Sequence, residues 1–348
     1  NVNVTSSQSQ DIVIANNVNL NVSNTCNSVY IGNNIRDNRA SVTGASMGNS
    51  NSSFIGSNIT LLDNHTWGAG FWDSQLIGSN IHYNGYGKSC VTAVVSNFNF
   101  RGDYLRESAV FGRNISLIAH NASDPSSWDG YRSNSYVNVL GSGIDVNSSG
   151  SISGIQIGGS CITISNPNNN GVYGSYNGKN IRITTNTGGV NGYIAGRDVC
   201  VTMNQSFDST VTGRDINIKH EGSLRNYISG TGITVNNTCA TRNLGSSLVG
   251  DYITLNNVSS TYAPFYGSYI SANDTTTNYS PIFGAYTTLC ASNTQYSPII
   301  GAYTTLCASN TQYSSIIGAN TRLCSTVACS SSIVGSNNNI YNTNVSAA

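Results

Sequence analysis

The sequence predicts an all-β fold, a single parallel β-solenoid running through residues 1–348 with about 18 rungs of about 17 residues each. Three observations support this prediction. Glycines preceded by two apolar residues recur at a fixed period, an alternation of apolar and polar residues follows each of them, and the residues that favour helices are scarce. About fifty residues are Asn, 36 are Gly and only 9% are charged, a composition that would indicate disorder if the period were absent.

The period is clearest in the C-terminal part of the chain. Glycines follow one another there every 17 residues, at Gly250, Gly267, Gly284, Gly301, Gly318 and Gly335. The same phase continues upstream, with some longer steps, at Ala15, Gly32, Gly56, Gly78, Val95, Gly112, Gly141, Gly159, Gly178, Gly196, Gly213 and Gly230. We call this series the glycine column, and its regularity predicts a repeat fold.

Each rung is expected to contain two strands. The third and fifth residues after the glycine are apolar, as in Ile59 and Leu61, and the fourth is usually polar, which predicts a strand with one buried face. A second, shorter strand precedes the glycine, as in Ser53-Phe54-Ile55-Gly56. A single rung cannot bury its own apolar face, so the rungs are expected to stack in parallel.

The second residue after the glycine is usually Asn or Asp. Asn tolerates left-handed backbone conformations, and its amide can donate a hydrogen bond to the neighbouring rung, so we predict an Asn ladder. The residues of this column are Asn17, Asn34, Asn58, Asn80, Asn97, Asn114, Asn180, Asp198, Asp215, Asn320 and Asn337.

Tyrosine forms two further columns near the C-terminus. One consists of Tyr252, Tyr269, Tyr286 and Tyr303, and the other of Tyr262, Tyr279, Tyr296 and Tyr313. Stacked phenol rings could serve only to support the sheet. They could instead form an exposed aromatic strip that binds sugars or a neighbouring molecule.

Residues 280–296 and 297–313 differ only at Phe283 and Ile300, which indicates a duplicated rung.

Three of the nine cysteines, Cys290, Cys307 and Cys324, occupy the same place in consecutive rungs. Rungs ~4.8 Å apart bring such residues within disulfide range. Two interpretations stay open: a bridge within one pair, with Cys324 then bonded to Cys329, or a ladder of small buried thiols.

Three insertions interrupt the period, near residues 37–53, 62–74 and 118–136. Two of them contain all three tryptophans. Aromatic loops on a polar rod are candidates for contact with a ligand or a partner, and the alternative is that they cover the core. The candidate contact residues are Trp67, Phe71, Trp72, Trp128, Tyr131 and Tyr136.

The charge balance argues against several partners. Fifteen basic side chains balance fifteen acidic ones, without the basic stripe that nucleic acids require or the Lys and Arg clusters of a membrane-surface protein. No apolar run approaches the ~20 residues of a spanning helix. We expect no nucleic-acid binding and no membrane insertion.

Catalysis is not expected either. The chain has two glutamates, and the stacked Asp198 and Asp215 stand beside Arg197 and Arg214, which suggests local charge compensation rather than a catalytic pair. The four histidines are scattered and there is no CxxC pair, so we predict no metal site, no cofactor and no enzymatic activity.

The chain begins at Asn1 without methionine, as a processed product would, and it contains many Asn-x-Ser/Thr sequons. Both features fit a secreted protein at the cell surface or outside the cell. The candidate N-glycosylation acceptors are Asn58, Asn64, Asn114, Asn121, Asn204, Asn257 and Asn273.

The rungs resemble the β-solenoid repeat regions of secreted adhesins and extracellular fibre proteins. Ser53-Phe54-Ile55-Gly56 and Ser315-Ile316-Ile317-Gly318 are similar to the Ser-x-Ile-Gly turn of trimeric autotransporter heads, which have a shorter period and more alanine. The rung length is similar to that of bactofilins, which are cytoplasmic and more charged. The richness in Cys, Thr and Ser resembles that of insect ice-binding solenoids.

This resemblance implies an extracellular structural or adhesive fibre protein. Neither terminus carries Lys or Glu that would block a strand edge, so we expect the chain to be a filament subunit that assembles end to end with itself, with surface glycans as further candidate partners. One alternative is an ice-binding solenoid, although His82, Asn99 and Arg182 interrupt the outward Thr and Ser column. Another is a tailspike-like solenoid that binds or cleaves glycans.

Overall fold

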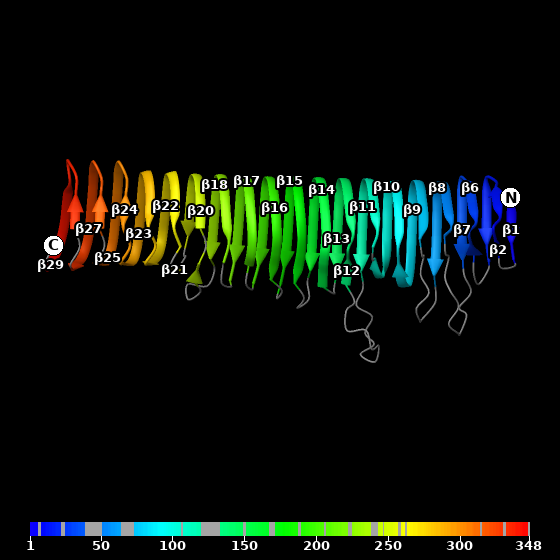
Figure 1. The fold of residues 1–348 in the computed structure, drawn as a ribbon, viewed down its shortest axis with the longest axis horizontal. Helices are drawn as coiled ribbons and strands as arrows, with labels where there is room; N and C mark the ends of the chain where they lie inside the picture. The colour runs from blue at the N-terminus through cyan, green and yellow to red at the C-terminus, as the bar shows by residue number, and fades with distance from the viewer. Residues whose placement is uncertain are drawn as a thin grey trace, which may run out of the picture. The chain divides into compact units, whose positions relative to one another are not determined.

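The computed structural model describes residues 1–5, 8–21, 25–38, 51–63, 73–105, 107–119, 133–148, 151–166, 171–186, 189–204, 207–221, 225–237, 243–245, 247–256, 259–261, 263–313, 315–329 and 332–346. All regular elements in these ranges are β-strands, as Figure 1 shows, which confirms the predicted all-β class. No helix among the described residues is long and apolar enough to cross a membrane.

The chain divides into two compact units, residues 1–187 and 188–348, and each is a parallel β-solenoid. Continuity of the solenoid from one unit to the other stays a prediction. The strands of the first unit are β1 (Val2–Val4), β2 (Gln8–Ser9), β3 (Ile12–Ile14), β4 (Asn17–Leu20), β5 (Thr25–Cys26), β6 (Val29–Gly32), β7 (Asn34–Asn38), β8 (Ser53–Asp63), β9 (Ser74–Ser89), β10 (Val91–Leu105), β11 (Ala109–Ala119), β12 (Ser133–Ser135), β13 (Asn138–Ser148), β14 (Ser151–Asn166) and β15 (Val172–Thr185).

The second unit has the same construction with more regular rungs. Its strands are β16 (Val190–Met203), β17 (Phe207–His220), β18 (Tyr227–Asn237), β19 (Asn243–Leu244), β20 (Ser247–Asn256), β21 (Ser259–Thr261), β22 (Phe265–Asn278), β23 (Ile282–Gln295), β24 (Ile299–Ile300), β25 (Tyr303–Gln312), β26 (Ser315–Ile317), β27 (Asn320–Cys329), β28 (Ser332–Val334) and β29 (Asn339–Ser346).

The strand register confirms the predicted glycine column. In the first unit Gly32 lies opposite Gly56, Gly56 opposite Gly78 and Gly78 opposite Val95. In the second unit Gly213 lies opposite Gly230. Positions one period apart in the sequence therefore stack, and the step is 17 residues in ten of the seventeen intervals between Ala15 and Gly335 and longer in the others.

The core is a stack of apolar side chains from alternate strand positions. The third and fifth residues after the glycine are buried in every rung except the last, for example Ile181 and Ile183 in β15, whereas Ile340 after Gly335 is 52% exposed. Of the two apolar residues before the glycine, only the first points inward: Val139 is 2% exposed, whereas Leu140 is 55% exposed. The sequence pattern of two adjacent apolar residues did not reveal this difference.

The predicted Asn ladder is present at a left-handed corner. Asn58, Asn80, Asn97 and Asn114 all have φ values between 52° and 56°. Each of the last three donates from Nδ2 to the Oδ1 of the Asn one rung earlier, at 2.7–3.1 Å. The ladder therefore combines a backbone conformation that Asn tolerates with a hydrogen bond that holds neighbouring rungs in register.

Candidate binding surface

The first tyrosine column forms a stacked ladder on the surface of the second unit. Tyr252, Tyr269, Tyr286 and Tyr303 come from β20, β22, β23 and β25. Successive ring centroids are 4.8–4.9 Å apart and the ring planes are within 5° of parallel. All four side chains are exposed, by 43–62%. The prediction of an aromatic ladder at this place is confirmed.

The second tyrosine column is also a ladder. Tyr279, Tyr296 and Tyr313 follow the ends of β22, β23 and β25, stack at 4.8–4.9 Å between centroids, and adopt φ values of 49–52°. All three side chains are exposed. The fourth predicted member, Tyr262, lies outside the described residues. This ladder marks a second left-handed corner of the rung.

Between the two ladders runs a column of apolar side chains, from the residue before each glycine, in which Tyr266, Ile300 and Ile317 are exposed and Phe283 is half-buried. Tyr266 and Phe283 stack at 5.0 Å. Residues 275–321 contain no Asp, Glu, Lys, Arg or His. We call the two ladders and this column the tyrosine-edged face.

The geometry of the ladders determines which contacts this face can make. Parallel rings at 4.8 Å cover one another's π-faces, so an approaching molecule meets ring edges and hydroxyl groups. Stacking of a sugar on an aromatic ring uses the open ring face, which only a ring at the end of a ladder would offer. The arrangement therefore favours a broad, flat contact with apolar and hydrogen-bonding groups over separate sugar subsites.

The cysteine column lies in the same rungs. Cys290 is opposite Cys307, and Cys307 is opposite Cys324, and all three are free thiols of intermediate exposure. The structure thus has a thiol ladder, one of the two arrangements that the sequence left open, but its thiols are half-buried and not buried as expected. Cys329 has no described side chain. Burial raises the pKa of the Cys307 thiol, and the Cys324 and Cys290 thiols beside it raise that pKa further.

This arrangement predicts slow alkylation of Cys307. Because the thiolate is the nucleophile and its pKa is raised, Cys307 in the folded protein should react with iodoacetamide more slowly at pH 8 than a free cysteine, and its rate should increase as the pH rises. The Cys324→Ser change removes a neighbouring thiol and should speed the reaction. Peptide mass spectrometry of timed samples measures both rates. Unreactive, bridged cysteines would contradict the thiol ladder.

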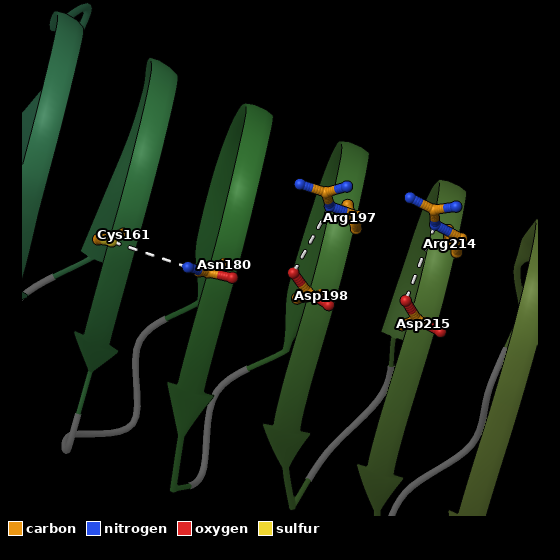
Figure 2. A network of polar contacts seen from close by, with 6 residues as sticks. All are labelled: Cys161, Asn180, Arg197, Asp198, Arg214 and Asp215. Carbon is orange, nitrogen blue, oxygen red and sulfur yellow. Dashed lines mark hydrogen bonds and ion pairs between the residues drawn. The ribbon is translucent and has the colours of Figure 1, made fainter.

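Two Arg–Asp pairs stand at the left-handed corner of β16 and β17, shown in Figure 2. Arg197 Nε lies 3.7 Å from Asp198 Oδ2, and Arg214 Nε lies 3.9 Å from Asp215 Oδ2. These side chains are well exposed, so each pair contributes little to stability. Each carboxylate has an adjacent guanidinium, as the predicted charge compensation requires.

In the first unit Cys161 takes the place of Asn in the ladder. It has a φ of 54°, and Asn180 Nδ2 donates to its Sγ at 3.8 Å, as Figure 2 also shows.

Among the residues that the structure describes, no group of three or more His, Cys, Asp or Glu side chains could hold a metal ion.

Most of the predicted loop contacts are not described by the structure. Trp67, Phe71, Trp72, Trp128 and Tyr131 lie outside the described residues, as does most of each insertion. Tyr136 is described: it precedes β13, is 65% exposed and has a φ of 54°. A role for these side chains in recognition stays a prediction.

The candidate glycosylation acceptors differ in the state of their amide nitrogen, the atom that would carry the glycan. Asn58, Asn114 and Asn273 donate through Nδ2 to the Asn of the preceding rung. Asn204, like Asn58 and Asn114, is exposed, and it follows the end of β16. Asn64, Asn121 and Asn257 lie outside the described residues.

A comparison with protein families, curated proteins and solved structures found no match to the chain.

Proposed function

We propose that this chain is an extracellular structural or adhesive fibre protein that associates with copies of itself. The observation that carries the proposal is the tyrosine-edged face, a strip of aromatic and aliphatic side chains that repeats rung after rung, is mostly exposed, and has no charged residue over 275–321. Exposed apolar patches of this kind mark interaction surfaces in soluble proteins.

The solenoid supports this role as a scaffold. Each rung contacts only its neighbours, so rungs can be added without disturbing a central core, and every added rung extends the same surface columns. The near-identical rungs 280–296 and 297–313 lie within the tyrosine-edged face, so the duplication lengthened this face. A binding strip whose length follows the number of rungs suits a fibre better than a compact ligand site.

End-to-end assembly is part of the same proposal. A solenoid rung has two hydrogen-bonding edges, so the first rung of one copy can pair with the last rung of another and extend the parallel ladder. Such a head-to-tail contact propagates into an open filament. Negative-stain electron microscopy of the purified protein should show threads much longer than one chain. Single rods at all concentrations would contradict this part.

The double change Tyr286→Lys and Tyr296→Lys tests the adhesive role. It places a charge in each ladder, and desolvating those charges against a flat surface should reduce the retention of the protein on polystyrene beads about tenfold or more. The matched control is Thr288→Lys with Thr305→Lys. These two threonines lie opposite each other in β23 and β25 and belong to neither tyrosine ladder. Equal retention of both variants would exclude the tyrosine-edged face as the adhesive surface.

A further inference from the structure

The first unit carries a second exposed strip that neither the fold nor the proposed function explains. The residue before each glycine-column position is apolar in seven successive rungs and points outward. Ile14 is 72% exposed, Leu140 is 55% exposed and Val94 is 52% exposed. We call these seven residues the aliphatic stripe: Ile14, Ile31, Ile55, Ile77, Val94, Phe111 and Leu140.

The stripe is straight and regular because the strand register stacks its members directly. Ile14 lies opposite Ile31, Ile31 opposite Ile55 and Ile55 opposite Ile77. The series continues through β10, β11 and β13, where Phe111 lies opposite Val94 on one side and Leu140 on the other. Six of the strands that carry it, β6, β8, β9, β10, β11 and β13, are labelled in Figure 1.

The solenoid does not need apolar residues at this position. Gly158 and Asn177 occupy it in the last rungs of the first unit, and Thr212 and Ser229 occupy it in the second unit. The strands pair in register at these places, and the inward neighbours Ile157, Tyr176, Val211 and Ile228 stay fully buried. The stability of the rung therefore does not explain why the residues of the stripe are apolar.

The surroundings of the stripe favour an apolar contact. The outward residues two places before and after it are mostly Ser, Thr, Asn or Gln, with Ile12 extending the stripe at the N-terminal end. Arg113, next to Gly112, is the one charged residue in these two flanking columns of the seven rungs. Two such surfaces can face each other with little repulsion and little desolvation of charge.

The dimensions of the stripe match a contact between two copies. Seven rungs at ~4.8 Å span about 34 Å, and five residues across at ~3.3 Å span about 16 Å. This gives roughly 550 Å² on each copy and about 1,100 Å² in total, which is just above the ~1,000 Å² expected of a biological interface. A row of side chains every ~4.8 Å also fits best against a surface with the same repeat, which a second copy provides.

We propose that the aliphatic stripe is the contact through which two copies of this chain pack side by side. A two-fold axis in the plane of the contact would bring the stripe of one copy against the stripe of the other, so the surface is its own complement. The contact is lateral and does not depend on the end-to-end assembly or the adhesion of the proposed function. It would make each thread two solenoids wide.

The triple change Ile77→Lys, Val94→Lys and Phe111→Lys tests the proposal. In dilute solution, before threads form, light scattering coupled to gel filtration should give twice the chain mass of 36.7 kDa for the unchanged protein and a single chain mass for the variant. A milder variant, Val94→Thr with Leu140→Thr, uses the residue found at Thr212 and should weaken the dimer without straining the strands. Circular dichroism checks that both variants are folded.

The control carries the same three charges on the same strands but in another outward column: His82→Lys, Asn99→Lys and Ser116→Lys. It should stay dimeric. The inference is overturned if the unchanged protein has a single chain mass at the highest attainable concentration, or if the stripe variants stay dimeric while folded, or if the control dissociates equally. Dimers that never form threads would contradict only the fibre proposal, and threads built from single solenoids would contradict only this inference.

Discussion

Replacing Gly213 with Ala is expected to destabilise the second unit by about 3–5 kcal/mol, because a methyl group at this position has no space. An added Cβ would stand 1.7 Å from the carbonyl oxygen of Gly196, which belongs to the backbone of the preceding rung. The φ of Gly213 is +146°, a value that side-chain-bearing residues rarely adopt. Relief of the clash would require separating two paired strands. Urea denaturation followed by circular dichroism measures the loss.

The matched control is Gly284→Ala in the same column. There the nearest atoms to an added Cβ are Thr287 Oγ1 at 2.8 Å and the Gly267 carbonyl oxygen at 2.9 Å, and φ is not in the left-handed region. The buried Thr287 side chain has to rotate and the Gly267 carbonyl has to shift, so the loss should be about 1–3 kcal/mol, less than at Gly213. If the two variants lose equal stability, the close approach of the Gly196 carbonyl oxygen is not the reason that position 213 requires glycine.

Val95 shows that the glycine column tolerates a side chain where the local backbone differs. It occupies the column between Gly78 and Gly112, is nearly buried, and does not have the positive φ of either neighbour. The sequence identified Val95 as the substitute for glycine from the period alone. It could not identify which glycines have positive φ: an added Cβ would stand 1.8 Å from the carbonyl oxygen of the preceding rung at both Gly230 and Gly250, and only Gly230 has the positive φ.

The rungs, their register and both ladders followed from the sequence because each is a periodic property. The same residue types return to the same place, so one correct alignment predicts the whole stack. The exposed stripe and the column between the tyrosine ladders did not follow, since two adjacent apolar residues such as Val139 and Leu140 look alike in the sequence. A signal was present: the second position becomes Gly158, Asn177 or Thr212 while the first stays apolar.

The tyrosine ladders were predicted as columns but their chemistry was not. Whether stacked rings expose their faces or only their edges depends on the separation and tilt of the rings, which are 4.8 Å and 5° between Tyr269 and Tyr286. The aromatic loops are the opposite case. Trp67 and Trp128 belong to insertions without a repeat, so neither periodicity nor strand register constrains where their side chains lie.

Deleting residues 297–313 should leave a folded solenoid that is one rung shorter, with a melting temperature within about 5 °C of the unchanged protein. These 17 residues are one whole rung. After their removal Tyr296 precedes Ser314, so the junction is the same Tyr-Ser pair that Tyr313 and Ser314 form in the unchanged chain. Phe283 would then lie opposite Ile317, and Cys290 opposite Cys324, so every column keeps its residue type. Differential scanning calorimetry measures the change.

The control deletion removes residues 297–312, one residue fewer, and should unfold the chain beyond the junction. Every later residue moves by one place, and because strand side chains alternate between faces, inward and outward positions exchange. Arg322 would enter the buried place of Leu306, and Ile317 would enter the place of Gly301, where an added Cβ would stand 2.0 Å from the Gly284 carbonyl oxygen. Limited proteolysis should then remove the segment after the junction from this variant only. Equal protease resistance of the two deletions would mean that the alternation of buried and exposed positions does not fix the register of these rungs.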